Sequence, residues 1–350
     1  DASSTLKQIR RSMKQAGDRI HSQLSSLLNG SMRTYLQDAV IINERDFDQI
    51  KKLIMTYGAV QSAIYSQPDI RSLSEYYSEE NAAYYYPERQ ECNHDIDIIG
   101  WDDHYPKENF VTQPEEDGAF ICKNSWGADF GQNGFFYISY YDTNIGVHNV
   151  VYTGVESTKN YDNIYQSDLC GWVGQIGYNK ESVYGANVFT AQKNEKLRAA
   201  GFYAVGKDTT YQVYVVKDFK DTSSFEKKER VAQGKLDNAG YYTIRFDKEI
   251  KVEPGEKFAI VIFVNTPDAV HPLAIEYAAD ATTAKVDLSD GEGYISPDGR
   301  TWESAEDTQS CNLCIKAYAE AVQEYSMWSM QSSMRFLIPF LIAASQIIPQ

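Results

Sequence analysis

The spacing of apolar side chains predicts helices near the start of the chain and short strands over the rest. Residues 4–28 carry apolar side chains at helical spacing among basic and polar ones, and the Asn-Gly-Ser at 29–31 would end that helix. A second helix is predicted over residues 47–57. Residues 43–46 offer capping side chains for it, and Gly58 can end it in a left-handed conformation.

After this helix, apolar and polar residues alternate as they do in half-buried strands. Strands are predicted over residues 59–66, 94–101, 120–123 and 134–141. Residues 67–90 repeat tyrosine and serine and are interpreted as a surface excursion. Several strands with one helix favour a half-barrel over a parallel sheet.

Seven short β-like runs follow a turn-rich segment that ends near residue 160. They lie at 186–191, 197–205, 211–216, 241–246, 258–264, 273–277 and 314–319. Turn residues separate them, among them Pro-Gly at 254–255 and Pro-Asp-Gly at 297–299. Strands at this spacing indicate a β-sandwich.

Composition and charge exclude two classes of partner. With 43% hydrophobic residues and a mean hydropathy of -0.47, the chain is typical of a soluble protein. Its net charge of -16 repels phosphate backbones, so nucleic-acid binding is not expected. The apolar stretch at 336–344 is broken by Pro339, whereas a helical span needs about 20 apolar residues. No membrane span is therefore expected.

The five cysteines are too few for a disulfide-stapled scaffold. They are Cys92, Cys122, Cys170, Cys311 and Cys314. The last two form one CxxC, but no second cysteine or histidine pair stands at zinc-ligand spacing. Buried cysteines are expected, with zinc or redox chemistry as the alternative. The Asp-Asp-His at 102–104 is interpreted as a turn, so the sequence predicts neither a metal site nor a cofactor.

One segment carries a specific chemical pattern. Residues 124–136 read NSWGADFGQNGFF, and His94 stands 30 positions before Asn124 in the run NHDIDIIGWDD. Together they resemble the histidine strand and the asparagine turn of papain-like cysteine peptidases. The helix, glycine and strand at 47–66 resemble the start of that family's barrel-like second domain. The run YDNIYQSDLCGWVG from residue 161 resembles the opening of the lectin-like domain that follows some bacterial members.

This resemblance implies a fold that is mainly β with some α, a papain-like barrel half-domain followed by a β-sandwich of jelly-roll type. The implied divisions are an unplaced helical segment at 1–39, the C-terminal half of the peptidase domain at 40–158, the lectin-like sandwich at 161–320 and a tail at 321–350. The implied function is proteolysis by a bacterial secreted thiol protease, located outside the cell or on the cell surface.

The resemblance also implies site residues. In a thiol peptidase an imidazolium stabilises the thiolate and then protonates the leaving amine, while a third group orients the ring. His94 and Asn124 take these two roles, and Trp126 lies over the pair. Cys92, Ala63 and Asp95 border the substrate pocket.

For Asp95, three interpretations stay open. Its carboxylate would favour a basic substrate side chain, raise the histidine pKa, or simply be exposed on the strand.

The cysteine segment of the family, of the type QGxCGSCW, is absent from this sequence. Cys92 is two residues from His94, which on a strand puts the two side chains about 6.5–7 Å apart, too far for a direct hydrogen bond. Cys170 lies in the later domain. We therefore expect a fragment that lacks the nucleophile and is inactive alone, and the start at Asp1 without a signal-peptide pattern fits this.

Two alternatives remain. One is a non-catalytic surface-binding protein, in which a pseudopeptidase scaffold carries a sandwich that binds glycan or protein, and the other is a truncated gene product. The expected partners are a peptide or protein substrate, the missing peptidase half and a glycan. A sugar-stacking platform could be built from Tyr165, Trp172, Tyr203, Tyr211, Tyr242 and Trp302, but the favoured interpretation is that they are core residues, because aromatics are common in sandwich cores.

Overall fold

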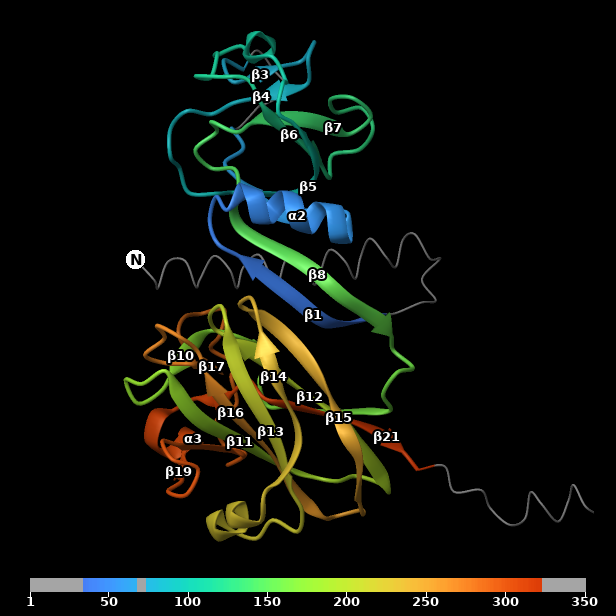
Figure 1. Ribbon diagram of the computed structural model, residues 1–350, viewed down its shortest axis with the longest axis vertical. Coiled ribbons are helices and arrows are strands. Elements are labelled where there is room, and N and C mark those ends of the chain that lie inside the picture. Colours follow the sequence, from blue (N-terminus) through green and yellow to red (C-terminus); the bar gives the residue numbers. More distant parts are fainter. Residues whose placement is uncertain (1–33, 68–73, 323–350) are drawn as a thin grey trace, which may run out of the picture.

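The computed structural model describes residues 34–67 and 74–322, which form two β-rich units stacked along the long axis of the molecule (Figure 1). The helix predicted at 4–28 and the apolar stretch at 336–344 lie outside the described residues. Within the described ranges, no helix is long and apolar enough to cross a membrane.

The first unit packs one α-helix against an open, mainly antiparallel sheet (Figure 1). Its elements are β1 (Thr34–Ile42), α2 (Phe47–Tyr57), β2 (Val60–Ile64), β3 (Tyr77–Ser78), β4 (Ala83–Tyr84), β5 (His94–Asp102), η1 (Lys107–Asn109), β6 (Ala119–Lys123), β7 (Phe135–Ser139) and β8 (Val147–Ser157). The strands pair in the order β3-β4-β7-β6-β5-β2-β8-β1. The predicted helix is confirmed at both ends, because the Asp46 side chain accepts the Gln49 N–H and Gly58 has a φ of 91°.

The tyrosine-rich segment at 67–90 differs from the predicted surface excursion. It contributes β3 and β4, and Tyr77, Tyr84 and Tyr86 are buried in the core of the first unit. The ring of Tyr77 stacks on Phe130 with centroids 5.3 Å apart. A tyrosine ring buries a large apolar area although its hydroxyl makes the sequence look polar, and this explains the wrong prediction.

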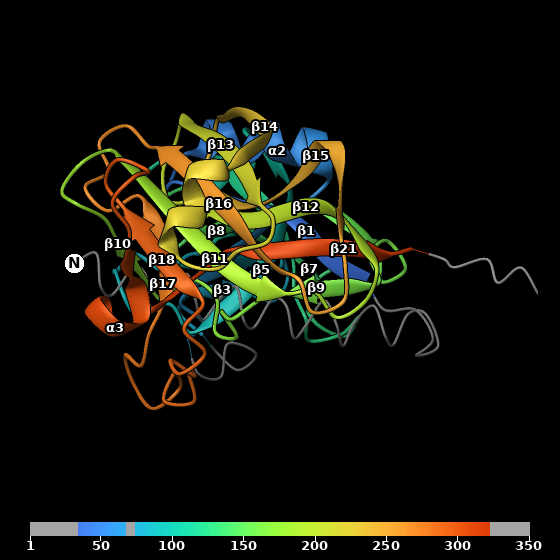
Figure 2. The ribbon, with the colours of Figure 1, turned by 90° about the horizontal axis from the view of Figure 1, so that it is seen from below.

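The second unit is a sandwich of two sheets with a small third sheet at one end (Figures 1 and 2). Its elements are β9 (Asn163–Tyr165), β10 (Gly174–Ile176), β11 (Ser182–Thr190), β12 (Glu195–Ala204), β13 (Thr209–Val216), η2 (Thr222–Lys227), β14 (Glu229–Leu236), β15 (Gly240–Val252), β16 (Lys257–Asn265), β17 (Leu273–Glu276), β18 (Gly293–Ser296), β19 (Glu303–Ser304), α3 (Ala305–Gln309), β20 (Asn312–Leu313) and β21 (Lys316–Ala321). One sheet runs β15-β12-β21-β9 and the other β14-β13-β16-β11-β18-β19. Phe202, Val213 and Ile262 are among the side chains that fill the core between them.

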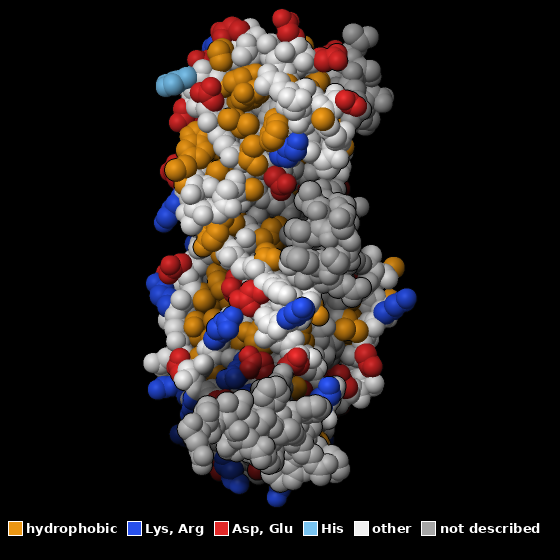
Figure 3. Space-filling view, turned by 90° about the vertical axis from the view of Figure 1, so that its right-hand side faces the viewer, with side chains coloured by type: hydrophobic (Ala, Val, Ile, Leu, Met, Phe, Trp, Pro, Cys, Tyr) orange, Lys and Arg blue, Asp and Glu red, His pale blue; other side chains and the backbone are white. Residues whose placement is uncertain are grey.

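The seven predicted sandwich strands are confirmed, whereas β14, β18 and the short strands β9, β10, β19 and β20 were not predicted. β14 has the sequence ERVAQGKL, and most of its residues are exposed. It lies at the edge of its sheet, where only one neighbour strand packs against it and charged residues are tolerated. On the face shown in Figure 3, acidic and basic side chains are interspersed over the second unit.

A single sheet connects the two units. β1 of the first unit pairs with β15 of the second, with Ala39 opposite Tyr241 and Val40 opposite Gly240. A Cβ atom at Gly240 would lie 2.0 Å from the carbonyl oxygen of Ala39, so this close approach requires glycine. β1 begins at Thr34, so the prediction of a helical segment at 1–39 is wrong for residues 34–39, which form a strand. The resulting sheet has 12 strands and fixes the units against each other.

Candidate active site

The two residues predicted to be catalytic lie at adjacent strand ends. His94 is the first residue of β5, and Asn124 follows the last residue of β6. The two strands pair antiparallel, with Asp97 opposite Lys123, so the start of one meets the end of the other. Nε2 of His94 lies 2.9 Å from Oδ1 of Asn124.

A second hydrogen bond fixes which end of the Asn124 amide faces the imidazole. The backbone N–H of Ser125 donates to Oδ1 of Asn124 at 2.7 Å. A backbone N–H can only donate, so the atom that it faces is the carbonyl oxygen, and Nε2 of His94 must carry a hydrogen. In the neutral ring this leaves Nδ1 as the nitrogen that can accept a proton.

Trp126 covers the imidazole. Its ring stacks on the His94 ring with centroids 4.8 Å apart and planes 25° apart. It also makes an edge contact, 4.9 Å between centroids, with the buried ring of Phe130. Asn124 is 5% exposed, so the His94–Asn124 hydrogen bond is shielded from bulk water, and shielding strengthens such a bond.

Glycines close the turn that carries Asn124 and Trp126. The Asn124 N–H donates to the Gly134 carbonyl at 2.9 Å, which brings the two ends of the turn together. Gly131 has a φ of 56°. A Cβ atom there would lie 2.3 Å from the carbonyl oxygen of Phe135, so the turn needs glycine for both conformation and space.

The residues predicted to border the substrate pocket lie beside this pair. Ala63 on β2 is opposite Asp95 on β5 and also opposite Val147 on β8. Opposite residues of antiparallel strands share a face of the sheet. Asp95 is 8% exposed, so the interpretation of Asp95 as an exposed strand carboxylate is wrong.

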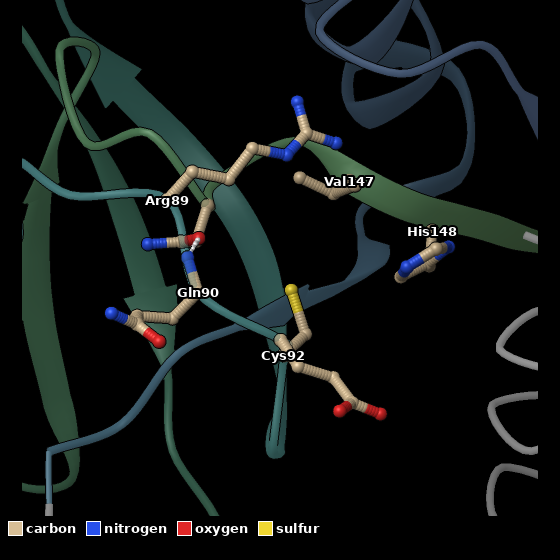
Figure 4. A pocket seen from close by; sticks show the side chains of 7 residues that line it. Arg89, Gln90, Cys92, Val147 and His148 are labelled. Atoms are coloured by element: carbon tan, nitrogen blue, oxygen red, sulfur yellow. Dashed lines mark hydrogen bonds between the residues drawn. The ribbon is translucent and has the colours of Figure 1, made fainter. Parts of the chain in front are cut away.

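Cys92 and Val147 line a cavity of about 330 Å³ next to this face (Figure 4). The other lining residues are Arg89, Gln90, Glu91, Asn144 and His148. The Cys92 sulfur points toward the side on which Val147 lies. Since β5 begins at His94, Cys92 precedes the strand, and the strand spacing assumed between Cys92 and His94 does not apply.

Two sequence-family comparisons cover most of the described chain. Residues 21–155 match the model for the papain family cysteine protease, and residues 164–319 match the model for the lectin like domain. The first unit therefore carries the likeness to the papain family, and the second unit carries the likeness to the lectin-like domain. The fold predicted from the resemblance is thus confirmed in both units.

Solved structures of the clostridial cysteine protease Cwp84 resemble both units together. One, described as the protease after propeptide cleavage, is 28% identical with a TM-score of 0.72, over 83% of this chain and 71% of that one. The other contains the cysteine protease and lectin-like domains of Cwp84, a surface layer associated protein of Clostridium difficile. It is 27% identical with a TM-score of 0.72, over 83% of this chain and 64% of that one.

One curated protein also matches a short segment. The endonuclease MutS2 of Lachnospira eligens is 64% identical over 42 residues. The match spans 12% of this chain and 5% of the endonuclease, so it does not extend nuclease activity to this chain.

The cysteines of the papain-family unit do not favour a thiolate. Burial, with a smaller contribution from the nearby carboxylates of Asp142 and Asp95, raises the pKa of Cys92 to about 12. Burial also raises the pKa of Cys122 well above its ordinary value. The nucleophile must be a thiolate, so neither side chain meets that requirement in this environment.

The lectin-like unit holds the remaining cysteines. Burial raises the pKa of Cys311 to about 12 and raises that of Cys314 as well, and Cys170 lies in the loop after β9. In the part of the chain that the structure describes, all five cysteines are free, and no group of three His, Cys, Asp or Glu side chains is arranged to hold a metal ion. The backbone N–H of His104 donates to Asp102 at 2.9 Å, which is the predicted turn.

Sequence reasoning did not select His148. It lines the cavity with Cys92, is 7% exposed and has no hydrogen-bond partner for Nδ1 among the described residues. Burial lowers its pKa, which favours the neutral ring. The only sequence signal was a histidine in the apolar run VHNVV, which is equally typical of a core residue.

The six aromatic residues proposed as a sugar-stacking platform do not share one surface. Tyr165 and Tyr211 belong to the core between the sandwich sheets. Trp172 and Tyr203 lie in a separate cluster. Trp302 packs with Phe225 over the six-stranded sheet. Tyr242 is partly buried and packs against the cores of both units. The six side chains form no single platform, and the favoured interpretation as core residues is confirmed for Tyr165.

Proposed function

We propose that this chain supplies the histidine and asparagine of a cysteine peptidase site, with His94 as general acid and base and Asn124 as its positioning residue. The observation that carries the proposal is the 2.9 Å contact between Nε2 of His94 and the amide oxygen of Asn124, stacked under Trp126. It leaves Nδ1 as the proton-accepting nitrogen of the neutral ring.

The reaction follows from this arrangement. A thiolate attacks the carbonyl carbon of the scissile peptide bond, and the carbon–nitrogen bond breaks as the imidazolium of His94 gives its proton to the leaving amine. Water then attacks the thioester carbon and gives its proton to the imidazole. The carbon–sulfur bond breaks, which releases the carboxylic acid and restores the thiolate and the imidazolium.

The thiolate comes from outside these 350 residues. Four of the five cysteines lie in surroundings that raise their pKa, and the fifth, Cys170, lies in the loop after β9 of the lectin-like unit. The polypeptide alone is therefore inactive. A preceding segment or a second chain that carries the family's cysteine segment would complete the site.

The substrate is a peptide or protein whose side chain enters the pocket bordered by Cys92, Ala63 and Asp95. Asp95 and Glu91 place two carboxylates at or beside this cavity, and its one cationic lining residue, Arg89, is 3.3 Å from Glu44. These charges favour a basic side chain. The likeness to a surface layer associated protein supports a site of action outside the cell or at the cell surface.

A complementation assay tests this function. The 350-residue chain alone should not hydrolyse labelled casein. Hydrolysis should appear when the part of the Cwp84 protease domain that this chain does not cover is supplied as a second polypeptide. In that complex His94→Ala should abolish the activity, and Cys92→Ala should retain it.

Two results would contradict the proposal. One is hydrolysis by the isolated chain that Cys92→Ala abolishes, since the nucleophile would then be internal. The other is a complex that forms by size-exclusion chromatography and hydrolyses casein equally well with His94→Ala, since the histidine would then have no catalytic role.

A further inference from the structure

A groove of about 430 Å³ lies where the two units meet. It is lined by Tyr35, Leu36, Ile164, Gln166, Tyr203, Tyr241, Lys316 and Tyr318. The first two residues come from β1 of the papain-family unit, and the others come from the lectin-like unit (Figure 1). Both units therefore build the groove, whose volume is in the range of about 300–1,000 Å³ that is typical of small-molecule sites.

Four of the eight lining residues are tyrosines. Phe202 and Ala204 point into the sandwich core, so Tyr203 between them points out of the sandwich toward the groove. Tyr241 and Tyr318 are 5% and 3% exposed, and their hydroxyl groups are hydrogen-bonded to each other. These two buried rings are fixed in place and support the wall, while the exposed ring of Tyr35 and the partly exposed ring of Tyr203 offer an apolar face.

The carboxylate of Asp168 balances the positive charge of Lys316 in the groove. Lys316 is the charged residue of the lining set, and its Nζ lies 2.5 Å from Oδ1 of Asp168. The Asp168 side chain is fully buried, and its Oδ2 has no hydrogen-bond partner among the described residues. The ammonium group has three N–H donors, so the pair presents donors to a ligand without a net charge.

The central strands under the groove leave no backbone edge for a peptide. β12 and β21 are each paired on both sides, so their backbone groups are used within the sheet. An extended peptide that adds to a sheet needs a free edge, and β9, the strand at the end of this sheet, offers an edge of three residues. An anion would meet a lysine whose charge Asp168 already neutralises.

A neutral sugar ring matches these walls, because its C–H face packs on aromatic rings and its hydroxyl groups pair with amide, ammonium and phenol groups. We propose that the groove binds a short neutral saccharide between Tyr35 of β1 and the outward-facing tyrosines of the lectin-like unit. Gln166 at the exposed rim and Lys316 at the base supply the polar contacts.

Calorimetric titration of the full 350-residue chain tests this binding. The probes are glucose, galactose, N-acetylglucosamine and its β-1,4-linked disaccharide, with glucuronic acid and a blocked tetrapeptide as the charged and peptide probes. At least one neutral sugar should saturate the chain at concentrations up to about 20 mM, a range that detects millimolar affinity. Tyr35→Ala should weaken that binding about tenfold, as the loss of an aromatic anchor does.

The matched control is Tyr57→Ala. Tyr57 is 48% exposed at the end of α2, and Tyr35 is 41% exposed, so both changes remove a similarly exposed ring, and only Tyr35 lines the groove. Gln166→Ala, at an exposed position, is a second groove variant with little risk to folding.

Three outcomes would overturn the proposal: no saturation by any neutral sugar, equal affinity in the Tyr35→Ala and Tyr57→Ala variants, or tighter binding of glucuronic acid or the peptide. His94 and Asn124 are not among the lining residues, so sugar binding and peptidase activity can fail separately.

Discussion

Replacing Asn124 with alanine tests the hydrogen bond on which the proposed catalytic pair depends. The change removes the oxygen that accepts from Nε2 of His94 at 2.9 Å and from the Ser125 N–H at 2.7 Å. A neutral hydrogen bond contributes about 0.5–1.5 kcal/mol net. Losing the contact with His94 should therefore lower the ratio of the Nε2–H to the Nδ1–H tautomer by about 2- to 13-fold. Losing both contacts should lower the free energy of unfolding by about 1–3 kcal/mol.

Nitrogen-15 NMR of the histidine rings measures the tautomer ratio directly, and it needs no peptidase activity. The signal of His94 can be assigned with a His94→Gln variant, and urea unfolding gives the stability. Asn93→Ala is the matched control, because Asn93 also accepts a backbone N–H at 2.7 Å, from Ser66. It should lose stability and keep the tautomer ratio.

A tautomer ratio that stays unchanged in Asn124→Ala would refute the assignment of Nε2 as the hydrogen-bearing nitrogen. Asn124→Asp, which retains an oxygen acceptor for both donors, should keep the Nε2–H form. If it does not, the acceptor oxygen is not what selects the tautomer.

The structure leads to three further predictions. Gly131→Ala should destabilise the chain more than Gly127→Ala in urea unfolding. Both glycines have a positive φ, which costs alanine about 1–2 kcal/mol, but only at Gly131 would the added Cβ also meet a backbone atom, at 2.3 Å. Equal losses of stability would mean that space does not matter at Gly131. Burial raises the pKa of Asp142 from 3.8 to about 6. The native state therefore binds that proton more tightly, and the free energy of unfolding should fall by up to about 3 kcal/mol as pH rises from 4 to 6. Urea titrations at several pH values should show this fall in the parent chain and not in Asp142→Asn; parallel curves would contradict it. The pKa of Cys92 is raised to about 12, so its alkylation by iodoacetamide at pH 8 should be at least about a hundredfold slower in the folded chain than in urea. Mass spectrometry of the labelled peptide measures both rates, and equal rates would show an accessible thiolate.

Local sequence was sufficient for the elements around the candidate site. Asp46 and Gly58 predicted the ends of α2, and the alternating run after His94 predicted β5. These features depend on capping, on left-handed backbone and on alternation of burial, all of which act within a few residues. The turn from Asn124 to Gly134 was expected from the family resemblance, and its glycines suit the local backbone, since Gly127, Gly131 and Gly134 all have a positive φ.

Partners far apart in the sequence were not predictable in this way. β1 pairs with β8 and with β15, which lies about two hundred residues later. Nothing in the run TYLQDAVII specifies either partner. The burial of Tyr84 and the cavity around His148 arose from the same kind of distant contact.

The sequence by itself determined the residue types at the candidate site: an imidazole, a carboxamide, an indole and the glycines of one turn, at a spacing that fits two neighbouring strands. The tertiary structure decided which nitrogen of His94 carries hydrogen, which cysteines are too buried to ionise, and how β1 and the sandwich enclose a groove. The difference is physical. Turns and caps are set by the conformational limits of adjacent residues, whereas burial, hydrogen-bond direction and cavities depend on groups that only the folded chain brings together.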